Sequence, residues 1–279
     1  MIPRCCYFLG KGLSLLLLFA FACASTDQSE KARRLSDASV NQAKELWEIM
    51  IKAKGGRERL YSVESVYRAL HWKKPTKESG YLRDRELFVL PDRYWAWLDW
   101  SGTVFGLEIN VYNLRQRVSY STGKSTGQHM WENDSGYPAS EFLRDLQLVH
   151  LLETRWLEPE PIAAWDRKEK GRRIRTVRAL VGDEILEYSL EEQQVLPFRI
   201  RRSWFLSVNP DREEYQKSFN LADYRDVSGI MLAHTVRWQD GKLTRKEQAI
   251  YEINPSYDPL IFDRQPVLKD GPEAWRSKP

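Results

Sequence analysis

Histidine is the side chain best suited to proton transfer near neutral pH, and this chain has four of them. They are His71, His129, His150 and His234, and each falls in a different expected element. No two have the spacing of an HExxH zinc motif, and no GxSxG turn, phosphate-binding loop or GxGxxG fingerprint occurs. The sequence therefore predicts ordinary hydrogen-bonded histidines, no metal site and no cofactor.

Acidic residues are plentiful, so any two could be offered as a general acid and a general base. Asp166, Asp183 and Glu184 lie near expected turns, where a solvated charge is the ordinary condition. Spacing singles out no pair of carboxylates. We therefore expect that the protein is not an enzyme.

Cysteine chemistry is confined to the start of the chain, because Cys5, Cys6 and Cys23 are the only cysteines. The residues after Cys23 therefore contain no internal disulfide, thiolate metal site or cysteine nucleophile. The one chemistry with a positional signal is covalent lipid attachment at Cys23.

The segment around Cys23 has the features of a leader. Arg4 and Lys11 precede a short apolar run that ends in small residues, as in a secretory signal peptide, which we place at residues 1–24. About a dozen apolar residues fall short of the roughly 20 that span a bilayer, although an uncleaved membrane anchor is the alternative.

Two cleavage chemistries remain open at this leader. Ala22-Cys23-Ala24 fits the small-x-small site of signal peptidase, whereas Ala20-Phe21-Ala22-Cys23 resembles a bacterial lipobox that lacks the usual leucine. A lipobox would leave Cys23 lipidated and bound to a membrane surface. The polar stretch that follows predicts a flexible tether over residues 25–37.

Composition excludes several classes of protein. A chain that is 42% hydrophobic and 12% aromatic is not disordered, and a mean hydropathy of −0.58 does not fit a multi-span membrane protein. The net charge of +4 falls to +2 without the leader, because 43 basic residues become 41 against 39 acidic ones. That balance argues against nucleic-acid binding.

Aromatic residues are the strongest sign of a binding site. Three of the 11 tryptophans, Trp95, Trp97 and Trp100, fall in one expected strand and occupy both of its faces. Such a strand is covered on both sides or lines a cavity, and core packing is the competing interpretation. The hypothesis is a lipid-binding cavity lined by Trp95, Trp97, Trp100, Phe142, Leu146 and Val149.

Basic residues gather at 167–175 and 199–202. If these strands are neighbours, their arginines form one basic face that contacts lipid headgroups or an acidic partner. The competing interpretation is a solvated strand face whose charges block aggregation. The residues assigned to this contact are Arg172, Arg173, Arg175 and Arg201.

Two main helices are expected to position these groups. Ser39 and Gln42 form a capping box for a helix over Ser39–Lys54, which has an apolar stripe and ends at Gly55-Gly56. A second helix over Glu141–Glu153 starts after Ser140 and is apolar over most of its circumference, so it is buried or faces a cavity.

Alternating apolar residues and turn signals predict strands through the rest of the chain. Their ranges are 63–72, 81–90, 94–100, 104–112, 115–121, 128–132, 172–181, 184–190, 196–207, 214–225, 230–239 and 242–253. Because the helices do not alternate with the strands, the fold class is α+β and not a doubly wound parallel sheet. We expect a curled antiparallel sheet of about ten strands, an incomplete β-barrel that wraps both helices.

Three segments resemble a known family. They are Ala-x-x-Leu-Trp-x-x-Met-Ile from Ala43, Asp223-Tyr224-Arg225-Asp226-Val227, and Tyr257-Asp258-Pro259-x-x-Phe262. They resemble the outer-membrane lipoprotein-sorting protein family, which shares the fold of the periplasmic lipoprotein carrier and its outer-membrane receptor. The resemblance covers residues 38–266, and 267–279 are expected to be a C-terminal tail.

The resemblance implies an apolar cavity that takes lipid or lipoprotein acyl chains, in a monomer on the periplasmic side of the bacterial envelope. A lipidated Cys23 implies anchoring to the outer membrane, and a removed one implies a soluble periplasmic protein. The first alternative function is a structural or assembly factor without a ligand, which a cavity filled by side chains would favour. The second is a hydrolase of cell-envelope material, which carboxylates or histidines converging in a cleft would favour.

Overall fold

The computed structural model describes residues 38–73, 81–100, 106–124, 127–132, 136, 139–205, 214–241 and 243–277. The expected signal peptide, Cys23 and the expected tether over 25–37 lie outside the described residues. No helix in the described part is both long and apolar enough to cross a membrane.

The first described helix covers residues 38–54 and buries the apolar stripe predicted from its spacing (Ala43, Leu46, Trp47, Met50 and Ile51). The predicted capping role of Ser39 is wrong, because the helix already includes residue 38. Instead, the Ser39 hydroxyl donates to the carbonyl of Ala164 at 2.9 Å and accepts from its amide at 3.0 Å. This contact ties the helix to a strand of the sheet.

The helix ends at the predicted glycine pair. Gly55 and Gly56 have φ values of 134° and 86°, and the Gly56 amide donates to the Ile51 carbonyl at 2.9 Å. A Cβ atom on Gly55 would lie 2.3 Å from the carbonyl oxygen of Gly229, so no other residue fits there. The short helix α2 (Arg57–Tyr61) follows directly.

Thirteen strands of the described chain form one antiparallel sheet, which is more than the ten or so expected. They are β1 (Ser65–Lys73), β2 (Tyr81–Val89), β3 (Arg93–Trp100), β4 (Gly106–Asn113), β5 (Val118–Gly123), β6 (Gly127–Glu132), β7 (Glu160–Glu169), β8 (Arg172–Val181), β9 (Glu184–Glu191), β10 (Arg199–Phe205), β11 (Glu214–Val227), β12 (Ile230–Asp240) and β13 (Leu243–Ile253). The unexpected strand is β7, an edge strand with a register shift between Pro161 and Ala163. Pro161 and the solvent-exposed positions of this edge strand conceal the alternation that marks a strand.

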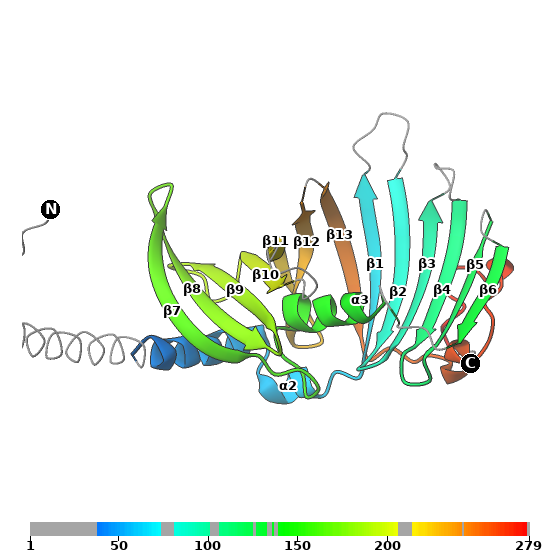
Figure 1. The fold of residues 1–279 in the computed structure, drawn as a ribbon, viewed down its shortest axis with the longest axis horizontal. Helices are drawn as coiled ribbons and strands as arrows, with labels where there is room; N and C mark the ends of the chain where they lie inside the picture. The colour runs from blue at the N-terminus through cyan, green and yellow to red at the C-terminus, as the bar shows by residue number, and fades with distance from the viewer. Residues whose placement is uncertain are drawn as a thin grey trace, which may run out of the picture.

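The sheet consists of two meanders joined at one seam. Its strand order is β6-β5-β4-β3-β2-β1-β13-β12-β11-β10-β9-β8-β7. Consecutive strands pair with each other except β6 and β7, which form the two edges of the sheet. At the seam, β1 pairs with β13 from Val66↔Ile253 to Trp72↔Glu247. The sheet is curled and open, as expected for an incomplete barrel (Figure 1).

The second helix lies on the inside of the curve and changes geometry along its length (Figure 1). It begins as α3 (Ala139–Asp145) and continues as a π-helix over Leu146–Leu151, so the predicted single α-helix over Glu141–Glu153 is only partly correct. Leu152, with a φ of 73°, ends it. All six residues of the π-helix are buried, as the broad apolar surface predicted.

Hydrophobic residues form two cores on opposite faces of the sheet. The inner core joins the helices to the concave face. The outer core lies on the other face of β1–β5, where the C-terminal segment covers it with Ile261, Phe262 and Trp275. Trp275 is fully buried and stacks on Tyr67 with the ring centroids 4.6 Å apart, so residues 267–277, expected as a tail, pack onto the sheet.

Candidate functional site

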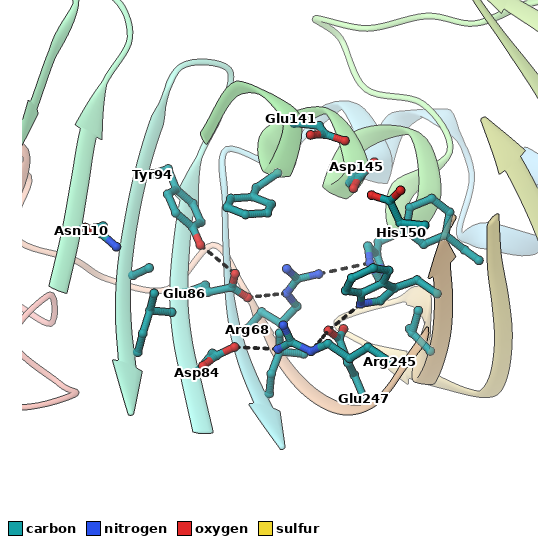
Figure 2. Close-up of a pocket in the computed structure, with 18 of the residues that line it drawn as sticks. Arg68, Asp84, Glu86, Tyr94, Asn110, Glu141, Asp145, His150, Arg245 and Glu247 are labelled. Atoms are coloured by element: carbon teal, nitrogen blue, oxygen red, sulfur yellow. Dashed lines mark hydrogen bonds and ion pairs between the residues drawn. The ribbon is translucent and has the colours of Figure 1, made fainter. Parts of the chain in front are cut away.

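A cavity of about 470 Å³ lies on the concave face, between α3 and strands of both meanders (Figure 2). Its volume is within the range of small-molecule sites, about 300–1,000 Å³. One part of the lining is apolar and rich in aromatic rings: Leu70, Ala96, Leu98, Trp100, Tyr112, Phe142, Phe219, Val236 and Trp238. Strand alternation brings all of these side chains to one face of the sheet except Phe142, which belongs to α3.

The structure divides the six residues predicted to line a lipid-binding cavity. Trp100 and Phe142 do line it. Leu146 and Val149 are buried in the inner core and are not among the lining residues. The predicted cluster is therefore only partly brought together.

Trp95 and Trp97 lie on the opposite face of β3 from Trp100. Trp95 is fully buried in the outer core, and Trp97 packs against that core from the edge. The aromatic residues on both faces of β3 are thus explained by two coverings, α3 inside and the C-terminal segment outside. The placement of Trp95 and Trp97 in the cavity is corrected accordingly.

The other part of the cavity wall is a chain of charged groups that the sequence analysis did not single out. Glu86 accepts hydrogen bonds from Arg68 Nε and from the Tyr94 hydroxyl, both at 2.7 Å (Figure 2). Burial alone would lower the pKa of Arg68, but the charge of Glu86 keeps that pKa above its usual range. Burial and the charge of Glu86 together raise the pKa of Tyr94 well above its usual value.

His150 connects this chain of hydrogen bonds to the π-helix. Its Nε2 lies 3.2 Å from Arg68 Nη1, and its Nδ1 lies 3.1 Å from the hydroxyl of Tyr251, which donates to the carbonyl of Ala233. Because arginine only donates, Nε2 accepts, and we assign the proton to Nδ1. Burial, followed by the charges of Arg68 and Lys54, holds the pKa of His150 well below its usual value, so the ring is neutral.

Two carboxylates, one on β2 and one on β13, share one arginine in the cavity wall. Arg245 contacts Asp84 through Nη2 at 2.7 Å and Glu247 through Nε at 2.7 Å. Trp238 donates its Nε1 hydrogen to the same Glu247 oxygen at 3.0 Å. The arginine, both carboxylates and the indole all line the cavity.

A third group of charges fixes α3 to the sheet. Lys217 Nζ lies 2.6 Å from Asp145 and 3.2 Å from Glu141, and Asp145 also pairs with Arg202, which in turn contacts Glu184 at 2.9 Å. Burial would lower the pKa of Lys217, but the charge of Asp145 raises it above its usual value. Both cations therefore stay charged in a largely buried setting, held by carboxylates of the helix.

The four arginines expected on one basic face fall on two faces of the sheet. Arg175 shares the inner face with Val177, and alternation places Arg173 there too, whereas Arg172 and Arg201 point to the outer face. The expected neighbour relation fails because β9 lies between β8 and β10. Two of the four pair with acids, since Arg172 contacts Glu191 at 2.8 Å and Arg173 contacts Asp166.

No group of three or more His, Cys, Asp or Glu in the described part of the chain could hold a metal ion. His150 is the histidine that lines the cavity.

A signal for the charged wall was present in the sequence, because Arg68 interrupts the apolar face of β1 between Val66 and Leu70. Its partner Glu86 could be recognised only from the pairing of β1 with β2, where the two residues are opposite each other.

No protein-family model matches the chain, and no curated protein sequence matches it. Among solved structures, it is similar to a LolA superfamily protein from Nitrosomonas europaea, at 9% identity and a TM-score of 0.44, over 76% of this chain and 94% of the other. A DUF1329 family protein from Desulfovibrio piger is 7% identical, with a TM-score of 0.49 and coverages of 79% and 96%. A domain named for outer-membrane lipoprotein sorting, from Vibrio parahaemolyticus, is 12% identical, with a TM-score of 0.44 and coverages of 82% and 97%. Two of these three bear the names of the group that the sequence motifs resemble.

Proposed function

We propose that the protein binds the acyl chain of a lipid or lipoprotein in the cavity beneath α3, and that it does so in the cell envelope. The observation that carries this proposal is the aromatic part of the cavity wall, where Trp100, Tyr112, Phe142, Phe219 and Trp238 surround an unfilled space. Aromatic and aliphatic walls of this kind bind apolar chains by removing their surface from water.

The energy available from such burial is sufficient for binding. Each buried methylene contributes about 0.8 kcal/mol, so about ten methylenes contribute roughly 8 kcal/mol before the cost of association. In a protein with a purely structural role, side chains would fill the interior. A solvent-accessible space of about 470 Å³ argues against that role.

Carboxylates and a histidine do converge at the cavity, which is the arrangement expected of a hydrolase. Their hydrogen bonding favours a structural role instead. Both ring nitrogens of His150 have partners, and Glu86 and Asp145 each accept from two buried or half-buried donors. Groups engaged in this way are poorly placed to take a proton from a substrate.

Export and lipid anchoring belong to the same proposal. The leader and Cys23 would bring the domain to the outer membrane, with the tether over 25–37 giving it reach. Mass spectrometry of the mature N-terminus tests this step, because a free Ser25 N-terminus would exclude a lipid on Cys23.

Acyl-chain binding is tested by quenching of tryptophan fluorescence with a brominated dodecyl chain on a neutral maltoside head. We expect saturable quenching that the double change Trp100→Phe and Trp238→Phe removes, because both indoles line the cavity. Trp131→Phe is the matched control, since Trp131 is exposed on the edge strand β6. Absence of quenching at saturation, or quenching that survives the double change, would refute the proposal.

A further inference from the structure

The wall of the cavity carries an excess of negative charge. Among its lining residues, three are cations, namely Arg68, Lys217 and Arg245. The lining carboxylates number seven, so the formal charge is 3 − 7 = −4: Asp84, Glu86, Glu108, Glu141, Asp145, Asp240 and Glu247. A cavity of one sign of charge attracts ligands of the opposite sign.

The cations in the wall are already occupied by carboxylates. Arg68 pairs with Glu86, Arg245 with Asp84 and Glu247, and Lys217 with Asp145 and Glu141. An anionic ligand would have to displace one of these carboxylates to reach a cation. A cationic ligand would meet carboxylates that keep free lone pairs.

Two lining carboxylates have no cation within 4 Å among the described residues. Glu108 accepts only from the Asn110 amide at 2.9 Å, and Asp240 accepts no hydrogen bond from the described part of the chain. Asp240 follows Trp238 at the two-residue spacing that places both on the same strand face. This carboxylate therefore stands beside an indole at the cavity wall.

Glu247 offers a third acceptor, and it is more than nine-tenths buried. Arg245 Nε forms an ion pair with its Oε1, and Trp238 Nε1 donates a hydrogen bond to the same oxygen. Both contacts use the same oxygen, and a carboxylate has about four acceptor sites in all, so this cavity-lining group can take a further donor.

Lys217 shows that this wall accommodates an ammonium group. Its Nζ is held by two carboxylates and also lies 5.4 Å from the centroid of the Phe219 ring and 5.8 Å from that of Trp238. Aromatic rings combined with carboxylates are the surroundings that favour alkylammonium ions.

We infer that the amphiphile bound in this cavity carries a cationic ammonium head, an inference that rests on the proposed function. Its head contacts the acidic and aromatic group formed by Trp238, Asp240 and Glu247. Its alkyl chain lies along the apolar wall near Leu98 and Phe142, in the cavity that Figure 2 shows.

The test compares three dodecyl amphiphiles below their micelle-forming concentrations: dodecyltrimethylammonium, dodecyl maltoside and dodecyl sulfate. Affinity for the full chain is measured by tryptophan fluorescence at low salt. We expect the ammonium compound to bind at least ten times more tightly than the sulfate, with the maltoside between them. Raising the salt concentration should reduce the affinity for the ammonium compound more than the affinity for the other two.

Asp240→Asn provides the residue-level test, and Asp183→Asn is its matched control, since Asp183 is exposed in the β8–β9 turn and does not line the cavity. We expect Asp240→Asn to reduce ammonium affinity several-fold, with maltoside affinity unchanged, and Asp183→Asn to change neither. If none of the three compounds binds, the proposed function fails. If the maltoside binds but the sulfate equals the ammonium compound, or if both variants behave alike, acyl binding stands and the cationic head is refuted.

Discussion

Lys54 is an amine enclosed by protein, and it allows a quantitative test of the fold. The side chain is fully buried at the end of the first helix, and its Nζ lies 5.1 Å from the centroid of the Tyr224 ring. Among the described residues it has no hydrogen-bond partner. Burial lowers its pKa from 10.5 to about 7, and its charge in turn lowers the pKa of His150.

The direction of the pH effect follows from this pKa. Between pH 7 and 10.5 the unfolded chain holds a proton on Lys54 that the folded chain has lost, so the free energy of unfolding rises with pH across that window. Below pH 7, Lys54 is protonated in both the folded and the unfolded chain, and the full cost of burying its charge lowers the free energy of unfolding. A difference of 10.5 − 7 = 3.5 pH units corresponds to about 5 kcal/mol at 1.36 kcal/mol per unit.

Lys54→Met keeps the length of the side chain and removes the titration. We expect the variant to be more stable than the natural chain by about 4 kcal/mol at pH 7 and by only about 2 kcal/mol at pH 9. Urea unfolding at both pH values gives these differences, and ionisation of other groups cancels in the comparison. Lys52→Met, at an exposed site on the same helix, is the control and should be close to neutral. A gain that is the same at both pH values, or a loss at both, would refute a buried neutral amine.

Three further changes test the packing. Trp275→Ala should lower the free energy of unfolding by about 3–5 kcal/mol, because it empties the outer core; a urea-unfolding loss below about 1 kcal/mol would contradict the packing of the C-terminal segment. Gly55→Ala forces a Cβ to within 2.3 Å of the Gly229 carbonyl and should lower the thermal midpoint by several degrees, and an unchanged midpoint would contradict that close approach. Asp145→Asn removes one of the charges that pair with buried Arg202 and should lower the free energy of unfolding by about 3 kcal/mol, measured in urea at neutral pH. A neutral outcome there would mean that α3 is not held by its charges.

Individual helices and strands could be predicted from the sequence where burial of one face imposes a regular spacing of apolar residues. The stripe of Trp47, Met50 and Ile51 and the stop at Gly55 were correct, because one helix face must be buried and a left-handed residue must end it. Strand β7 was not predicted, because an edge strand that contains Pro161 and is partly exposed to solvent needs no strict alternation of apolar and polar residues. Local pattern therefore identifies elements that are covered and misses those at a rim.

The site depended on contacts that sequence pattern does not contain. The sequence left open whether the aromatic strand is covered on both faces or lines a cavity, and which face meets the cavity is decided by Trp275, from the other end of the chain. The charged wall depends on the pairing of separate strands, as with Arg68 and Glu86. The π-helix that brings His150 to Arg68 leaves no sequence signal, because both helical forms bury the same apolar residues.

The seam between β1 and β13 determines when the middle of the sheet can be completed. Strand β1 is made early, pairs with β2, and then keeps its other edge unsatisfied until residues 243–253 have been synthesised. During that interval its apolar face and free backbone groups form an open edge of the kind that pairs with wrong partners. A chain cut short before β13 would therefore expose the edge of β1 at the centre of the sheet. The full-length chain is at risk of aggregation through the same edge until residues 243–253 have been synthesised.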